Sequence, residues 1–159
     1  MIVVNSKEEL KELINRRIKE QGPSCDLNDI DVSKIDDMSF LFSGSEFNGD
    51  ISKWDVSNVR DMSYMFHGSR FNGNISKWNV SNVRDMGFMF DGSYFNGNIS
   101  KWNVSNVESM DYMFTCSKFD GDIRKWNVSS VRNVFWMFTY SPLEGKEPEW
   151  YHIAKRYKG

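Results

Sequence analysis

Apolar and polar positions along the chain repeat with a period of 24. The segment I-S-K-W-D-V-S-N-V, which starts at Ile51, returns almost unchanged from Ile75 and Ile99 and with three substitutions from Ile123. A more divergent copy occupies residues 27–35, which gives five copies. One such unit cannot cover its own apolar face, so we expect the copies to stack. The resulting column of tryptophans comprises Trp54, Trp78, Trp102 and Trp126, with Trp150 at the next position.

Each copy contains two different apolar patterns. Ile51, Trp54 and Val56 have the L-x-x-L-x-L spacing that is typical of the strand in leucine-rich repeats. From Val59 to Phe66 apolar residues recur at intervals of three and four, which favours a short helix that ends at a left-handed glycine such as Gly68. We therefore predict an α/β solenoid that is leucine-rich-repeat-like, with five coils of twenty-four residues, parallel strands, short helices and helical caps at both ends.

Two further helical patterns would close the ends of this solenoid. Residues 6–21 begin with a capping box of Ser6 and Glu9 and carry an apolar face, and Gly22-Pro23 stops the helix. Residues 148–158 predict a second helix whose inward residues are Trp150, Ile153, Ala154 and Tyr157. The expected single domain consists of an N-terminal strand and helix cap (1–26), the five-repeat solenoid (27–145) and a C-terminal helical cap (146–159). Capped ends favour a monomer.

A longer string of letters carries a family resemblance. The pattern W-[DN]-V-S-N-V-x-x-M-x-x-M-F, followed by F-N-G-[DN]-I-S-K, covers about residues 27–145 and resembles the BspA-like leucine-rich-repeat surface proteins, including mycoplasmal lipoproteins. The resemblance implies an adhesive or protein-binding role at a bacterial surface. Copies in that family are usually one residue longer than those of this chain, and Val59 stands where classical leucine-rich repeats have Asn or Cys.

Composition gives few signs of reaction chemistry. The formal net charge of -2 gives no reason to expect nucleic-acid binding. Cys25 and Cys116 are expected to be reduced thiols, and His67 and His152 have no partners at metal-ligand spacing. We expect no enzyme activity, no cofactor, no metal site and no membrane span. The first residues become charged after Val4, unlike a secretion signal, which favours a cytoplasmic location, or the cell surface if an export signal has been removed.

Candidate binding residues fall on two sides of the predicted coil. Between the inward residues of the predicted strand lie a column of lysines and a column of Asp and Asn: Lys53, Lys77, Lys101, Lys125, Asp55, Asn79, Asn103 and Asn127. They form either a polar, basic platform for an acidic partner or a solvated ladder of mutually hydrogen-bonded residues whose lysines blunt the sheet. The copies differ most on the helical side, where candidate contacts are Arg60, Arg84, Arg132, Arg70, Tyr94, Phe135 and Trp136. Phe135 and Trp136 either pack under the C-terminal cap or, if exposed, anchor a partner.

These features together predict a protein–protein interaction module inside the cell, such as a regulator or a phage-type inhibitor of a host enzyme. One alternative is a surface adhesion or structural repeat protein. The other is a carbohydrate or nucleic-acid binder that uses aromatic residues, including an exposed tryptophan column; the face that Trp54 shares with Val56 favours burial instead.

Overall fold

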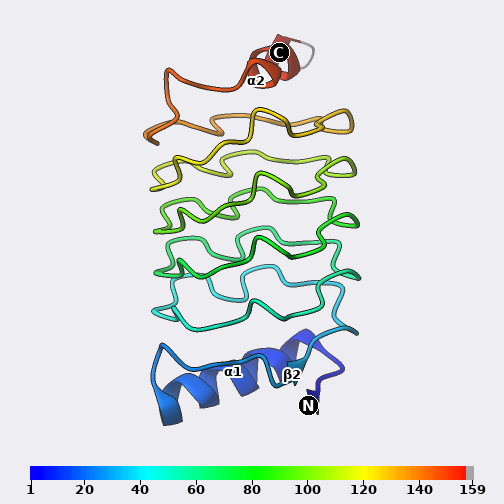
Figure 1. Cartoon of the computed structure of the whole chain (residues 1–159), viewed down its shortest axis with the longest axis vertical. Helices are drawn as coiled ribbons and strands as arrows, with labels where there is room; N and C mark the ends of the chain where they lie inside the picture. The colour runs from blue at the N-terminus through cyan, green and yellow to red at the C-terminus, as the bar shows by residue number, and fades with distance from the viewer. Residues whose placement is uncertain (157–159) are drawn as a thin grey trace.

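The chain runs through a stack of coils that lies between helix α1 at one end and helix α2 at the other (Figure 1). The computed structural model describes residues 1–156. Residues 24 apart in the sequence are neighbours in adjacent coils, because isolated parallel bridges join them: Asp26 to Asp50, Asp37 to Asp61, Asp61 to Asp85, Asp85 to Ser109 and Ser109 to Asn133. We call such a set of equivalent residues a column.

The interior of a coil differs from the predicted strand and helix. Between Ile51 and Val59 the backbone turns twice, with Trp54 N–H donating to the Ile51 carbonyl at 3.2 Å and Val59 N–H to the Val56 carbonyl at 2.9 Å. The Asp55 carboxylate accepts the backbone N–H of Ser57 at 3.0 Å. An Asp or Asn side chain that bonds two residues ahead favours a turn over an extended strand, so the predicted strand is replaced by turns.

The short helix predicted over 59–66 is also replaced by turns. Tyr64 has φ 58° and Gly68 φ 61°, and left-handed residues interrupt a right-handed helix. The N–H groups of Met62, Tyr64 and Phe66 donate to carbonyls of the next coil at 2.9–3.0 Å, where a helix would use carbonyls four residues back. Every coil therefore exchanges backbone hydrogen bonds with its neighbours, and its apolar side chains still point inward.

The tryptophans form the interior column. Trp54, Trp78, Trp102 and Trp126 are 4–5 % exposed, and each indole N–H donates to a carbonyl 27 residues back at 2.9–3.1 Å. The rings of Trp54 and Trp78 lie nearly parallel, with centroids 6.5 Å apart. These indoles are not available to stack on sugars or bases.

Helix α1 (Lys7–Gln21) covers the first coil. The Ser6 hydroxyl accepts the Glu9 N–H at 3.2 Å, and Gly22, at φ 88°, ends the helix by donating its N–H to the Ile18 carbonyl at 2.8 Å. Leu10, Leu13 and Ile14 are buried against the coil. Strand β1 (Ile2–Val3) pairs in parallel with strand β2 (Ile30–Asp31).

Helix α2 (Glu149–Arg156) covers the last coil through an inward stripe of Trp150, Tyr151 and Ala154. Tyr151 is buried and meets the Phe138 ring edge-on, with centroids 5.0 Å apart. The prediction that Ile153 points inward is wrong: it is 47 % exposed, because Tyr151 occupies the inward position and leaves Ile153 on the outer flank. Tyr157, also predicted to point inward, lies outside the described residues. Among residues 1–156, neither helix is both long and apolar enough to cross a bilayer.

Candidate partner-binding surface

A column of aromatic residues at the surface has an unusual backbone. Four of the five are the third residue of a hydrogen-bonded turn, such as Met62–Met65, in which the N–H of Met65 donates to the Met62 carbonyl at 3.2 Å. All of them have φ between 54° and 61°, in the left-handed region that favours glycine. The column comprises Phe40, Tyr64, Phe88, Tyr112 and Trp136.

Four of these aromatic rings stack on one another; we call Phe40, Tyr64, Phe88 and Tyr112 the aromatic ladder. Successive ring centroids are 4.4, 4.5 and 4.6 Å apart, and the ring planes lie within 9° of parallel. A left-handed conformation costs a non-glycine residue about 1–3 kcal/mol, and an aromatic pair contributes about 0.5–1.5 kcal/mol. Stacking thus offsets part of a backbone strain that recurs in every coil. Strain of this kind is typical of functional surfaces.

Carboxylates line the aromatic ladder. Asp37, Asp61 and Asp85 form a column three residues before the rings, and each accepts the backbone N–H two residues ahead at 2.8 Å. Burial raises the pKa of Asp85 above its ordinary value, and the neighbouring charges of Asp61 and Asp111 raise it further. Burial also raises the pKa of Asp111, although its carboxylate accepts the Phe135 N–H at 2.6 Å.

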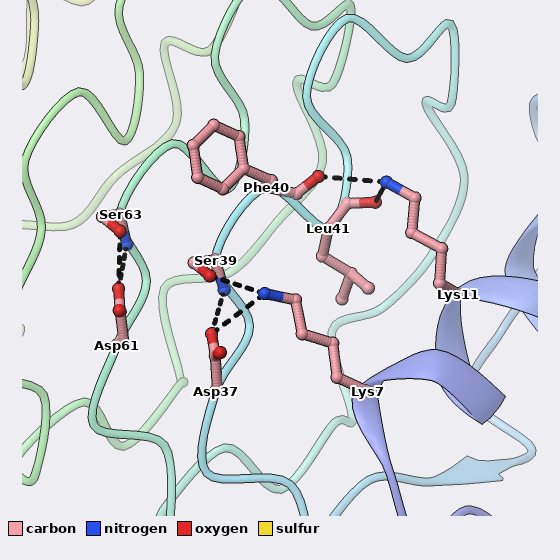
Figure 2. Close-up of polar contacts among 8 residues, drawn as sticks. All are labelled: Lys7, Lys11, Asp37, Ser39, Phe40, Leu41, Asp61 and Ser63. Carbon is pink, nitrogen blue, oxygen red and sulfur yellow. Dashed lines mark hydrogen bonds and ion pairs between the residues drawn. The ribbon is translucent and has the colours of Figure 1, made fainter.

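Helix α1 closes the N-terminal end of the aromatic ladder with two lysines (Figure 2). Lys7 Nζ lies 3.2 Å from the Asp37 carboxylate and 2.5 Å from the Ser39 hydroxyl, and Lys11 Nζ donates to the Phe40 carbonyl at 3.2 Å. Burial would raise the pKa of Asp37, but the Ser39 hydrogen bonds and the Lys7 ion pair outweigh it and lower that pKa.

The opposite end of this column is open. Trp136 is 59 % exposed, Phe135 52 % and Tyr140 77 %; we call these three the C-terminal corner. Phe135 and Trp136 border a cavity of about 380 Å³ whose other walls include Tyr151, Glu144 and Glu147. Of the two roles predicted for Phe135 and Trp136, the exposure favours an anchor over packing beneath the cap.

Ser43, His67 and Asp91 lie in line across three coils. The Ser43 hydroxyl is 3.4 Å from His67 Nδ1, and His67 Nε2 is 3.4 Å from the Asp91 carboxylate. The order is that of a nucleophile, a base and an acid, but acyl transfer also needs donors for an oxyanion. The nearby N–H groups of Phe42 and Gly44 already donate to carbonyls of the next coil, at 2.9 and 2.7 Å. The arrangement is better described as a polar ladder beside the Tyr64 ring, whose centroid is 5.6 Å from that of His67.

The structure places the lysine column, which we call the lysine ridge, on the exposed surface over the tryptophan column: Lys53, Lys77, Lys101 and Lys125. The neighbouring Asp and Asn column closes local turns, because each side chain accepts a serine N–H two residues ahead at 3.0–3.1 Å: Asp55, Asn79, Asn103 and Asn127. The Asp and Asn side chains thus accept hydrogen bonds within their own coil, where a ladder of mutually hydrogen-bonded residues was one expectation.

The remaining predicted residues lie apart from one another. Arg60, Arg84 and Arg132 are exposed in the column before the carboxylates, and Arg84 pairs with Glu108 at 3.6 Å. The Arg70 guanidinium lies 5.2 Å from the centre of the Tyr94 ring. Sequence reasoning missed the aromatic ladder, although a purely aromatic column among variable polar ones was a signal for it. Among residues 1–156, no cluster of three or more His, Cys, Asp and Glu side chains is arranged to hold a metal ion.

A family model described as "Mycoplasma protein of unknown function, DUF285" matches residues 10–115 and again residues 69–150. Together the two matches span most of the chain. The chain belongs to the DUF285 family. Residues 69–115 fall within both matches, as expected for tandem copies, so the repeat character of this DUF285 protein is supported by sequence and structure alike. No curated protein and no solved structure matches the chain significantly.

Proposed function

We propose that this DUF285 chain is a non-enzymatic module that binds a partner protein through the C-terminal corner. The observation that carries the proposal is the joint exposure of Phe135, Trp136 and Tyr140, the first two of which line a cavity. Large aromatic side chains next to a pocket are the residues that most often dominate the binding energy of protein interfaces. The resemblance to BspA-like proteins, described as adhesive or protein-binding, agrees with this role.

The stacked coils suit such a module. Inward residues repeat almost without change, whereas exposed residues vary from coil to coil, as at Arg70, Tyr94 and Lys118. A stack of this kind keeps its core while its surface adapts to one partner. We propose to class it as a leucine-rich-repeat-like solenoid in which turns replace the strand and the helix. The cytoplasmic location stays a prediction, which cell fractionation tests.

Site-specific cross-linking tests the proposed function. A photoreactive residue is introduced at Tyr140 in one variant and at Lys77, on the lysine ridge, in another, and both are expressed in cells that make the protein. We expect a discrete protein adduct at position 140 and none at 77. In the Tyr140 variant, the added double substitution Phe135→Ala/Trp136→Ala should weaken capture about 30-fold, the effect of losing about 2 kcal/mol of anchor energy.

The matched control reverses the lysine ridge (Lys53→Glu, Lys77→Glu, Lys101→Glu and Lys125→Glu) in the same cross-linking chain. Capture that survives the aromatic double substitution but disappears with the lysine reversals would move the binding site to the ridge and refute the proposal.

A further inference from the structure

The first coil shows what chemistry the aromatic ladder accepts. The Lys7 ammonium donates to the Asp37 carboxylate and the Ser39 hydroxyl. Lys11 donates to the carbonyl of Phe40, whose ring is the first of the aromatic ladder (Figure 2). Both lysines belong to α1, four residues apart, and therefore on the same side of that helix. The chain thus places two lysines of its own against the first step of its acidic and aromatic surface.

The following coils repeat the carboxylate of Asp37 but have no lysine in the place of Lys7. Asp61 and Ser63 stand in the same columns as Asp37 and Ser39, and the Asp61 carboxylate accepts both the Ser63 N–H at 2.8 Å and the Ser63 hydroxyl at 2.6 Å (Figure 2). Asp85 continues the column in the third coil. Among residues 1–156, no lysine or arginine forms an ion pair with Asp61, Asp85, Asp91 or Asp111.

The pKa values of Asp37 and Asp85 shift in opposite directions, in agreement with the presence of a lysine beside the first and not the second. The pKa of Asp37 is lowered where Lys7 is present, although burial opposes it, whereas burial and two neighbouring carboxylates raise the pKa of Asp85. The Asp91 carboxylate lies 3.4 Å from His67 Nε2, and burial raises its pKa despite that contact. A cation placed beside Asp85 would relieve the repulsion from Asp61 and Asp111.

We infer that the partner of this module presents an arginine- and lysine-rich segment, which lies along the aromatic ladder, pairs with Asp61, Asp85, Asp91 and Asp111, and ends at Trp136. This inference rests on the proposed function and names the chemical class of the partner. The exposed Trp136 ring at the end of the ladder favours arginine over lysine, because a planar guanidinium stacks on an aromatic face more readily than an ammonium does. The cavity at the corner extends the same chemistry: Glu144 and Glu147 line it, and Lys155 Nζ lies 5.9 Å from the centre of the Tyr151 ring.

Fluorescence anisotropy with labelled nona-arginine tests the inference at roughly physiological ionic strength. The ladder variant carries Asp61→Asn, Asp85→Asn, Asp91→Asn and Asp111→Asn. The control variant carries Asp26→Asn, Asp50→Asn, Asp55→Asn and Asp122→Asn, which remove the same charge from other columns. The chain already has Asn133 in the column of Asp61 and Asp85 and Asn74 in the column of Asp26, Asp50 and Asp122, and thermal unfolding checks that both variants fold.

We expect the ladder variant to bind nona-arginine at least tenfold more weakly than the unmodified chain and the control variant to change affinity less than twofold. Nona-lysine should bind more weakly than nona-arginine, and Phe135→Ala/Trp136→Ala should narrow that difference. Absence of nona-arginine binding, or equal weakening in both variants, overturns the inference. Cross-linking separates the two proposals: capture at position 140 that depends on Phe135 and Trp136 but not on the four aspartates leaves the proposed function standing and removes the basic partner.

Discussion

Trp150 stacks on Trp126 although the two residues belong to different kinds of structure. Trp126 lies in the fifth coil and Trp150 in helix α2, yet their ring centroids are 6.3 Å apart and the Trp150 indole donates to the Ile123 carbonyl at 2.8 Å. Trp126 makes the equivalent bond to Ile99 at 3.0 Å. The helix therefore ends the stack by supplying the side chain that a further coil would have supplied.

Loss of a central tryptophan should be far more costly than loss of this terminal one. Trp78 is 4 % exposed and stacked between coils, so we expect Trp78→Ala to lower the free energy of unfolding by about 3–5 kcal/mol. Trp150 is only half-buried, so Trp150→Ala should cost less than half as much. Guanidinium denaturation of both variants measures the difference. Equal losses of unfolding free energy in the two variants would contradict the claim that a central tryptophan of the column contributes more than the terminal one.

Glycine should stabilise the chain at position 116. Cys116 is exposed, has φ 54°, and stands in the column of Gly44, Gly68 and Gly92. Cys116→Gly should raise the free energy of unfolding by about 1 kcal/mol by relieving left-handed strain, whereas Cys116→Ala should not, because alanine keeps the Cβ atom. Thermal unfolding of the two variants decides the matter. A glycine variant no more stable than the alanine variant would show that the strain is absent.

Neutralising Asp85 should stabilise the chain at neutral pH and not in acid. Because the folded-state pKa of Asp85 is raised, the folded chain holds this proton more tightly than the unfolded chain. Stability therefore falls as the pH rises from the ordinary value of about 3.9 through the raised one, and it stays lower above that window. Asp85→Asn keeps an acceptor for the Gly87 N–H, so its gain should appear above the window and vanish below it. Urea unfolding at pH 3 and pH 7 checks this; a gain equal at both pH values would reject the electrostatic cause.

One tryptophan should dominate solvent quenching. Trp136 is 59 % exposed, Trp150 is half-buried and the other four indoles are 4–5 % exposed. Acrylamide should therefore quench mainly Trp136, and Trp136→Phe should remove most of the quenchable emission. If Trp150→Phe removes as much, the C-terminal corner is not as open as described.

The period and the ends of the stack were readable from the sequence, because identical side chains one repeat apart stack only if the coils are in register. The helix predicted over 6–21 is present as α1, since its cap, apolar face and terminating glycine are all local signals. The helix predicted over 59–66 is not, because turns that repeat every few residues can also bring Met62, Met65 and Phe66 inward. Spacing alone does not distinguish these two backbones.

The aromatic ladder escaped prediction for a different reason. Propensity gives no sign that Tyr64 or Phe88 adopts a left-handed conformation, since the strain is offset by contacts between coils. Leucine-rich repeats usually have an asparagine ladder at the position of Val59. In this chain the asparagines stand one position earlier, and the Asn58 and Asn82 amides donate to carbonyls 25 residues back at 2.7 Å. Both ladders consist of contacts between coils, which local sequence propensity does not predict.

A heteronuclear NMR titration of the full chain with nona-arginine tests the central claim most directly, because it maps the bound surface residue by residue. The account predicts amide shift changes confined to residues 61–67, 85–91, 109–115 and 133–140, with little change at 52–57 and its equivalents. Changes centred on the lysine ridge, or spread evenly over the chain, would contradict it.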